Sequence, residues 1–207
     1  MGFPRWLWLS GEGWALRISL GLSVFAALAI WDLARKGRQA TRWKEYAFLF
    51  AATAAAMAYG LANDMITVTI SPLYFIEHER LPLDTPNVRG IAAVVAMKAT
   101  WSLGLVLGAV LLIANNPMRG RAQLPYRKLY LKLLCPFIAA GTMAFVFGAA
   151  AWSGWFDAWL EIEGAMRPVE CVYYVHTGAY PGGFLGGIAA VASVVLERRG
   201  ERVRATA

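Results

Sequence analysis

The sequence is poor in charge, in cysteine and in histidine. Only 16% of its 207 residues are Asp, Glu, Lys or Arg, and there are 2 Cys and 2 His. Cys135 and Cys171 fall near opposite ends of successive apolar segments, which places their Cα atoms beyond the ~7 Å that a disulfide can bridge. The chain also has no low-complexity tract, no clear internal repeat and little length outside its apolar segments. These absences exclude a disulfide-stabilised fold and leave little chain for a soluble domain.

Apolar sequence is what the chain has in excess, at 58% of all residues. A membrane span needs ~20 mostly apolar residues to cross a hydrocarbon core of ~30 Å. Because the bilayer core offers no water to the backbone, each span must be helical. We therefore predict an all-α membrane protein with a single domain, a bundle of about five transmembrane helices. The apolar segments that reach the required length are Trp14–Leu33, Tyr46–Ile70, Gly90–Ile113, Tyr130–Trp152 and Cys171–Leu196.

The basic residues are distributed unevenly among the connections between these segments. Lys and Arg stay on the cytoplasmic side of a membrane because they are translocated poorly. The pattern predicts a multi-pass protein with its N-terminus outside and its C-terminus in the cytoplasm. It also explains the net charge of +7 through membrane insertion and anionic lipid, so nucleic acid is not expected as a partner. The clusters are Arg35, Lys36, Arg38, Arg42 and Lys44; Arg119, Arg121, Arg127, Lys128 and Lys132; and Arg198, Arg199, Arg202 and Arg204.

Residues 153–168 combine tryptophan and phenylalanine with acidic residues. Such mixed spacing is typical of a helix that lies in the membrane interface. We predict a short surface helix on the outer side, and membrane lipids as the expected partners of the whole bundle.

Two charged residues lie inside predicted spans, where each costs about 2.5–3.5 kcal/mol on insertion scales. Asp64 is roughly 9 Å below the outer end of its helix and Lys98 roughly 12 Å below the outer end of its own, at 1.5 Å per residue. Because the depths nearly coincide, we predict that Asp64 and Lys98 pair, with Arg17 as the competing partner. The pair would serve either stability or the handling of a proton or substrate.

A polar stripe extends from Asp64 along the second span. The spacing of 3, 4, 3 and 4 residues puts the five members on one face of a helix. Pro72 ends or kinks this helix, and an unwound chain would instead place alternate residues on one side. In either case hydroxyls, a phenol and an imidazole gather at the outer end. The members are Asp64, Thr67, Ser71, Tyr74 and His78.

The fifth span presents His176 and Tyr180, four residues apart and on one helix face. A ligand site would combine them with the polar stripe and Lys98. A metal or haem site is the alternative, with His78, His176, Glu77 and Glu170 as ligands. No two of these four have a diagnostic ligand spacing, so the sequence leaves the cofactor open.

Glycines four residues apart mark two spans. Gly104 and Gly108 lie in the third span, and Gly182 and Gly186 in the fifth. Such spacing leaves one helix face without side chains, so that another helix can approach closely. We predict helix packing at these faces, either within the chain or with a second copy or another membrane partner.

The segment from Asp64 to Phe75 and the segment from His176 to Gly183 resemble an uncharacterised group of small multi-pass bacterial inner-membrane proteins. That group carries an Asp-x-x-Thr-x-x-Ile-Ser-x-Glu-Tyr-Phe pattern and a His-x-x-x-Tyr-x-Gly-Gly pattern. This chain departs at Leu73, where the pattern has glutamate. The resemblance implies a bacterial inner membrane and supplies no activity.

Three functions fit these features. The first is a non-enzymatic membrane protein that binds or passes a small ligand or ion through a polar site near the outer leaflet. The second is a membrane redox protein or enzyme that uses the two histidines for a metal or haem. The third is a structural or assembly subunit whose polar groups only set the helix register.

Overall fold

The computed structural model describes residues 13–116, 123–157 and 166–206. These ranges are mostly helical and contain no strand. The prediction of five apolar helices is confirmed, because five helical segments in the described part are long and apolar enough to cross a membrane. The segments are Leu16–Lys36, Arg42–Ile70, Val88–Ala114, Tyr126–Trp152 and Arg167–Gly200.

The helices extend beyond the apolar segments from which they were predicted. The fourth segment is divided at Leu133 into two helices, and the last helix continues through Pro181 without a break. The predicted surface helix falls largely on residues 158–165, outside the described residues, while residues 153–157 form turns. The elements are α2 (Trp14–Lys36), η2 (Gly37–Gln39), α3 (Arg42–Ile70), α4 (Pro72–His78), α5 (Val88–Ala114), α6 (Tyr126–Lys132), α7 (Leu134–Trp152) and α8 (Arg167–Thr206).

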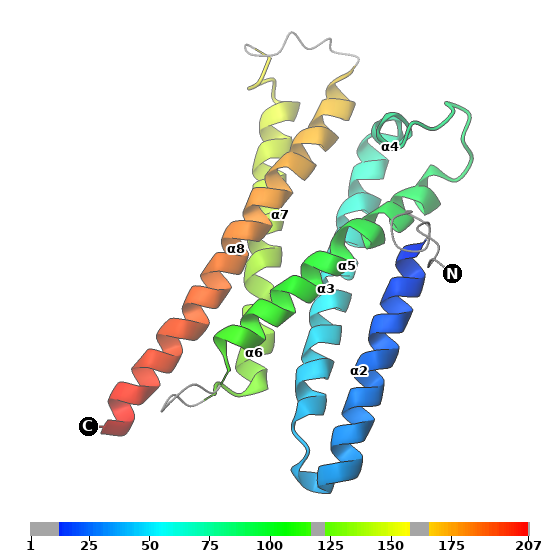
Figure 1. Ribbon diagram of the computed structural model, residues 1–207. Helices are drawn as coiled ribbons and strands as arrows, with labels where there is room; N and C mark the ends of the chain where they lie inside the picture. The colour runs from blue at the N-terminus through cyan, green and yellow to red at the C-terminus, as the bar shows by residue number, and fades with distance from the viewer. Residues whose placement is uncertain (1–12, 117–122, 158–165, 207) are drawn as a thin grey trace, which may run out of the picture.

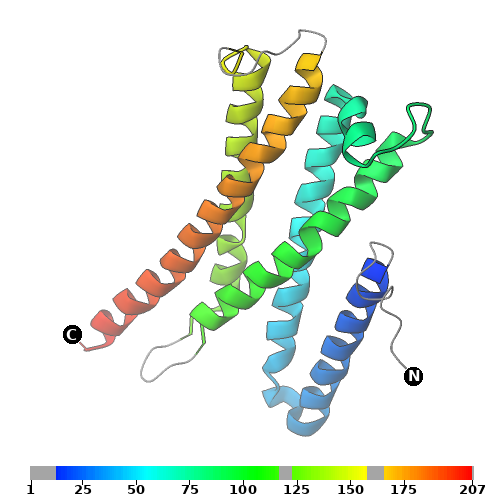
Figure 2. The same cartoon turned by 45° about the horizontal axis from the view of Figure 1, so that its top comes forward.

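Two helix pairs organise the bundle (Figure 1). Helices α3 and α5 cross each other closely, and helices α7 and α8 lie side by side along their length. Helix α2 lies against α3, on the side away from α7 and α8 in both ribbon views (Figure 2). We call the end of the bundle that carries α4 the α4 end, and the opposite end, where α6 lies, the α6 end.

Glycine allows the close approach within each pair. A Cβ added at Gly104 of α5 would lie 2.6 Å from the carbonyl oxygen of Ala52 in α3. A Cβ added at Gly182 of α8 would lie 2.6 Å from the carbonyl oxygen of Ala139 in α7. Both glycine faces are therefore covered by helices of the same chain. A partner bound through them would first have to displace α3 or α7.

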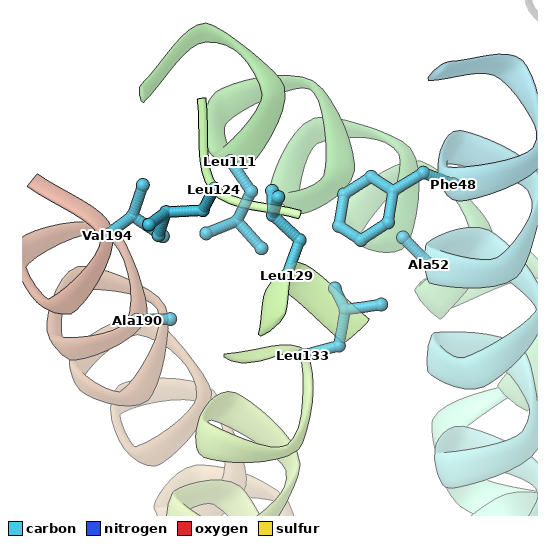
Figure 3. Packing of buried hydrophobic residues seen from close by; sticks show 8 residues of the cluster. All are labelled: Phe48, Ala52, Leu111, Leu124, Leu129, Leu133, Ala190 and Val194. Carbon is cyan, nitrogen blue, oxygen red and sulfur yellow. The ribbon is translucent and has the colours of Figure 1, made fainter. Parts of the chain in front are cut away.

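An apolar cluster joins the two pairs toward the α6 end (Figure 3). The side chains converge from α3, α5, α6 and α8, together with the chain segments that flank α6. These aliphatic and aromatic side chains are buried against one another and form a close-packed apolar core at this end of the bundle. The members are Phe48, Ala52, Leu111, Leu124, Leu129, Leu133, Ala190 and Val194.

Polar contacts fasten the chain around this cluster. The side chain of Asn115 donates to the carbonyl of Leu124 at 3.0 Å and accepts from its backbone N–H at 2.8 Å. The guanidinium of Arg198 donates to the carbonyl oxygens of Ala114, the last residue of α5, and of Asn116, two residues further on. Helix C-termini leave such carbonyls without partners inside the helix, and a cation there is favourable.

Replacing Asn115 by Ala should lower the free energy of unfolding by about 2 kcal/mol, because both backbone groups of buried Leu124 lose their partner. Thermal unfolding of the purified protein in detergent measures the change. Asn116→Ala is the matched control, since its side chain is exposed and only its backbone carbonyl accepts a hydrogen bond. Equal stability of the two variants would contradict the prediction.

Large apolar side chains cover the outside of the bundle. Ile66, Val106, Ile138, Phe145 and Phe184 lie on four different helices and are exposed. A water-soluble protein rarely exposes so many apolar side chains on every helix, whereas lipid favours them. The exposed surface thus agrees with helix length and composition in indicating a membrane protein.

Candidate functional site

A break in the chain separates α3 from α4 and positions the site. Pro72 disfavours helical conformation in the residue before it, and Ser71 accordingly has extended backbone angles, φ −148° and ψ 98°. Its hydroxyl accepts a hydrogen bond from the backbone N–H of Tyr74 at 3.4 Å, as an N-cap of α4. The predicted disruption at Pro72 is confirmed, and it turns α4 toward both α5 and α8.

Asp64 and His176 meet at the junction of α3 and α8. The carboxylate oxygen Oδ1 of Asp64 lies 3.8 Å from Nε2 of His176. The Asp64 side chain is 8% exposed and the His176 side chain 17% exposed. Nε2 of His176 is fully enclosed and has no hydrogen-bond partner within the described residues. A carboxylate and an imidazole thus face each other inside the bundle, slightly too far apart for a direct hydrogen bond.

Aromatic rings surround this pair. The ring of Tyr74 stacks nearly parallel to the imidazole of His176, with 5.2 Å between centroids and 11° between planes. It also stacks on His78, with 5.6 Å and 7°. Phe75 meets His176 edge to face at 6.2 Å. Tyr74 therefore connects the exposed imidazole of His78 with the enclosed imidazole of His176.

The other members of the predicted polar set occupy supporting positions. Thr67 is buried, and its hydroxyl donates to the carbonyl of Asp64 one turn earlier at 3.4 Å. Ser71 is buried and caps α4. Tyr180 lies one turn beyond His176 along α8, but its side chain is 61% exposed. Asp64, Tyr74, His78 and His176 therefore form the centre that the structure brings together.

The predicted pairing of Asp64 with Lys98 is wrong. The α5 face that packs on α3 contains Ala96, Thr100 and Gly104, spaced four residues apart. Lys98 is two residues from both Ala96 and Thr100, or about 200° around the helix at 100° per residue. It therefore lies away from α3, and no ion pair joins it to any residue in the described ranges. The prediction rested on equal depth, but depth does not specify the direction around a helix.

The predicted metal ligands do not gather into one group. Within the described residues no three His, Cys, Asp or Glu side chains are placed to hold a metal ion. Glu77 is exposed on α4, and Glu170 lies in the first turn of α8. The two histidines are linked through the Tyr74 ring rather than through a shared ligand position.

Two residues near Asp64 were not predicted from the sequence. Asn63 donates from Nδ2 to Oδ1 of Asp64 at 3.1 Å. The hydroxyl of Tyr59, about a turn and a half toward the α6 end of α3, is enclosed and has no hydrogen-bond partner in the part of the chain that the structure describes. Its ring stacks on Phe137 of α7 at 5.7 Å. Neither residue belongs to the 3-4 spacing of the stripe, although Asn63 is adjacent to a charged residue inside a span.

No protein-family model, no curated protein and no solved structure matches this chain. The chemistry of the site therefore follows from its own geometry. Titratable or hydroxyl-bearing side chains lead from the surface at His78 through Tyr74 and His176 to Asp64. Within the described residues, ring stacking and the 3.8 Å approach of His176 to Asp64 link these side chains, and no hydrogen bond joins one to the next. Asp and His inside a membrane are residue types from which proton relays are built.

Proposed function

We propose that this protein passes protons across the bacterial inner membrane through the Asp64–His176 pair. The observation that carries the proposal is a buried carboxylate 3.8 Å from an enclosed imidazole nitrogen that has no other partner among the described residues. Ionisable residues inside a membrane are expensive, and proton relays built from Asp, Glu and His are one of their main uses.

The dimensions of the site favour a proton over a larger ion or ligand. Neither Asp64 nor His176 lines the cavity beside Lys98 that is described below, and neither lines a second cavity between α3 and the start of α5. The residues that line this second cavity are Val68, Thr69, Pro72, Asn87, Val88 and Arg89. The Tyr74 ring is stacked directly on the imidazole of His176. A proton requires no cavity of its own, only groups that approach one another by about 1 Å more to reach a charge-assisted hydrogen bond.

The charge pattern predicts how the protein is oriented in the membrane. The residues of the basic clusters whose side chains the structure describes lie at the α6 end, which the positive-inside rule assigns to the cytoplasm. They are Arg35, Lys36, Arg38, Arg42, Lys44, Arg127, Lys128, Lys132, Arg198 and Arg199. The α4 end would then face outward, with His78 as the group that exchanges protons with the outside. Protons would move from His78 toward Asp64 past Tyr74 and His176, all in the outer half of the bundle.

The apolar cluster at the α6 end limits how protons could cross the bundle. Below Tyr59 the path meets the apolar cluster that contains Phe48 and Leu129, both fully buried. A continuous water-filled pore is incompatible with such packing. Transfer would therefore proceed in steps, each requiring the two helix pairs to move slightly against each other, because Asp64 and His176 belong to different pairs.

Proton flux into proteoliposomes tests this function. Vesicles of lipid and purified protein would contain a pH-sensitive dye, and a potassium gradient with valinomycin would drive protons inward. We expect acidification several times faster than in protein-free vesicles and in vesicles with an unrelated five-helix protein. An acidification rate equal to that of both controls, in either direction of the potential, would overturn the proposal.

A further inference from the structure

A second site lies on the face of α5 that turns away from α3. A cavity of about 380 Å³ opens there between α5 and the chain that follows α4. One wall consists of aliphatic side chains of α5 followed by Lys98, and Glu79 lies at the opening. The lining residues are Glu79, Pro86, Asn87, Gly90, Ile91, Val94, Val95 and Lys98.

Two opposite charges line this cavity without neutralising each other. Lys98 makes no hydrogen bond or ion pair with any residue in the described ranges, and the same holds for the carboxylate of Glu79. Lys98 is half-buried within a membrane helix, where an uncompensated ammonium is unfavourable. The cavity therefore provides an unmet positive charge at depth and an exposed negative charge at the mouth.

The direction of the lysine side chain follows from helix geometry. Side chains of an α-helix point back toward its N-terminus. The ammonium of Lys98 therefore rises from its Cα toward the first turn of α5, along Val94 and Ile91. Beyond Lys98, in the other direction, the same face continues with Trp101 and Leu105. The charge thus lies between a polar mouth and an apolar face that continues into the membrane.

We propose that this cavity binds a phospholipid with a primary ammonium headgroup, of the phosphatidylethanolamine type. In such a lipid the acyl chains, the phosphate and the ammonium follow one another from the membrane interior outward. The site offers Leu105 and Trp101, then Lys98, then Glu79 in the same order. Each charge of the headgroup meets its opposite, and the acyl chains lie along the apolar face. This site shares no lining residue with the Asp64–His176 pair, so it stands independently of proton transfer.

Native mass spectrometry of the full-length protein tests the proposal. The protein, purified in detergent, would be titrated with phosphatidylethanolamine and with phosphatidylglycerol of identical acyl chains. Phosphatidylglycerol has the phosphate but carries a glycerol in place of the ethanolamine, so it lacks the ammonium with which Glu79 would pair. We expect phosphatidylethanolamine to bind about fivefold more tightly, the effect of one partly exposed ion pair.

Variants of Glu79 and Lys98 test the role of each charge separately. Glu79→Gln should abolish the preference, and Asp84→Asn, an exposed acid of the same connection that does not line the cavity, should preserve it. Lys98→Met should weaken binding of both lipids, whereas Lys98→Arg should retain it. Circular dichroism and gel filtration show whether each variant is folded. Equal or tighter binding of phosphatidylglycerol by the unaltered protein, or unchanged binding by Lys98→Met, would overturn the proposal.

Discussion

Replacing Gly182 by Ala should destabilise the protein by about 2–3 kcal/mol, while the same change at the adjacent Gly183 should be tolerated. A Cβ at Gly182 would lie 2.6 Å from the Ala139 carbonyl oxygen and 2.9 Å from the Ala140 Cα. Both are backbone atoms, so they cannot move aside without separating α7 from α8. A Cβ at Gly183 would first meet the Ala140 Cβ at 3.7 Å, an ordinary contact.

Comparing Gly182→Ala with Gly183→Ala cancels the difference in helix propensity between glycine and alanine. Ala is preferred over Gly inside a helix by about 1 kcal/mol, so Gly183→Ala should if anything stabilise α8. The next turn repeats the contrast, since a Cβ at Gly186 would lie 2.5 Å from the Pro136 Cα and one at Gly187 would lie 3.8 Å from a Leu107 methyl. Unfolding by SDS or heat in detergent measures all four variants. Similar stability of Gly182→Ala and Gly183→Ala would contradict the packing of α7 on α8.

Asp64→Asn and His176→Gln should each reduce proton flux by at least roughly tenfold, since each removes a group that accepts and releases the proton. The stability of the protein should change little. The two groups lie 3.8 Å apart and form no direct hydrogen bond, and polar contacts between membrane helices average only about 0.6 kcal/mol. Flux in proteoliposomes and unfolding in detergent are measured on the same preparations.

The double variant separates a functional pair from a structural one. Asp64→Asn with His176→Gln should conduct no better than either single variant, because both transfer groups are absent. Glu77→Gln is the matched control, an exposed acid on α4 whose loss should leave flux unchanged. If the single variants unfold more easily and the double variant recovers stability, the pair serves helix packing instead.

The elements of the fold could largely be predicted from the chain itself. Hydrophobic length specified the five spans, because each must satisfy its backbone internally in lipid. Pro72 specified the break between α3 and α4, because it disfavours the helical conformation of Ser71. The periodicity also selected Asp64, Tyr74 and His78, three of the four residues at the centre of the site.

The choice of partners could not be predicted in the same way. Lys98 has the charge opposite to that of Asp64 and a similar predicted depth, yet it lies on the opposite side of α5 from the glycine face. His176 comes from a helix that is more than a hundred residues away in the sequence, and nothing local specifies which face of α8 turns toward α3. Tyr59 was missed for the same reason, since its enclosed hydroxyl depends on where α7 lies.

The glycine faces also show what the sequence could predict and what it could not. The sequence indicated close helix approach at Gly104 and Gly182, because a face without side chains permits it. It could not decide whether the approaching helix belonged to this chain or to another. The structure places α3 against the first face and α7 against the second.

The amino-acid sequence by itself thus determined a helical membrane protein and the approximate positions of its spans, because these depend on local hydrophobicity and on the length of helix that a bilayer requires. Only the tertiary structure decided the azimuth of each helix and therefore which side chains meet. It brought Asp64 to His176 and left Lys98 facing a separate cavity, because the small residues of α5 direct one face of that helix onto α3 and turn the other away.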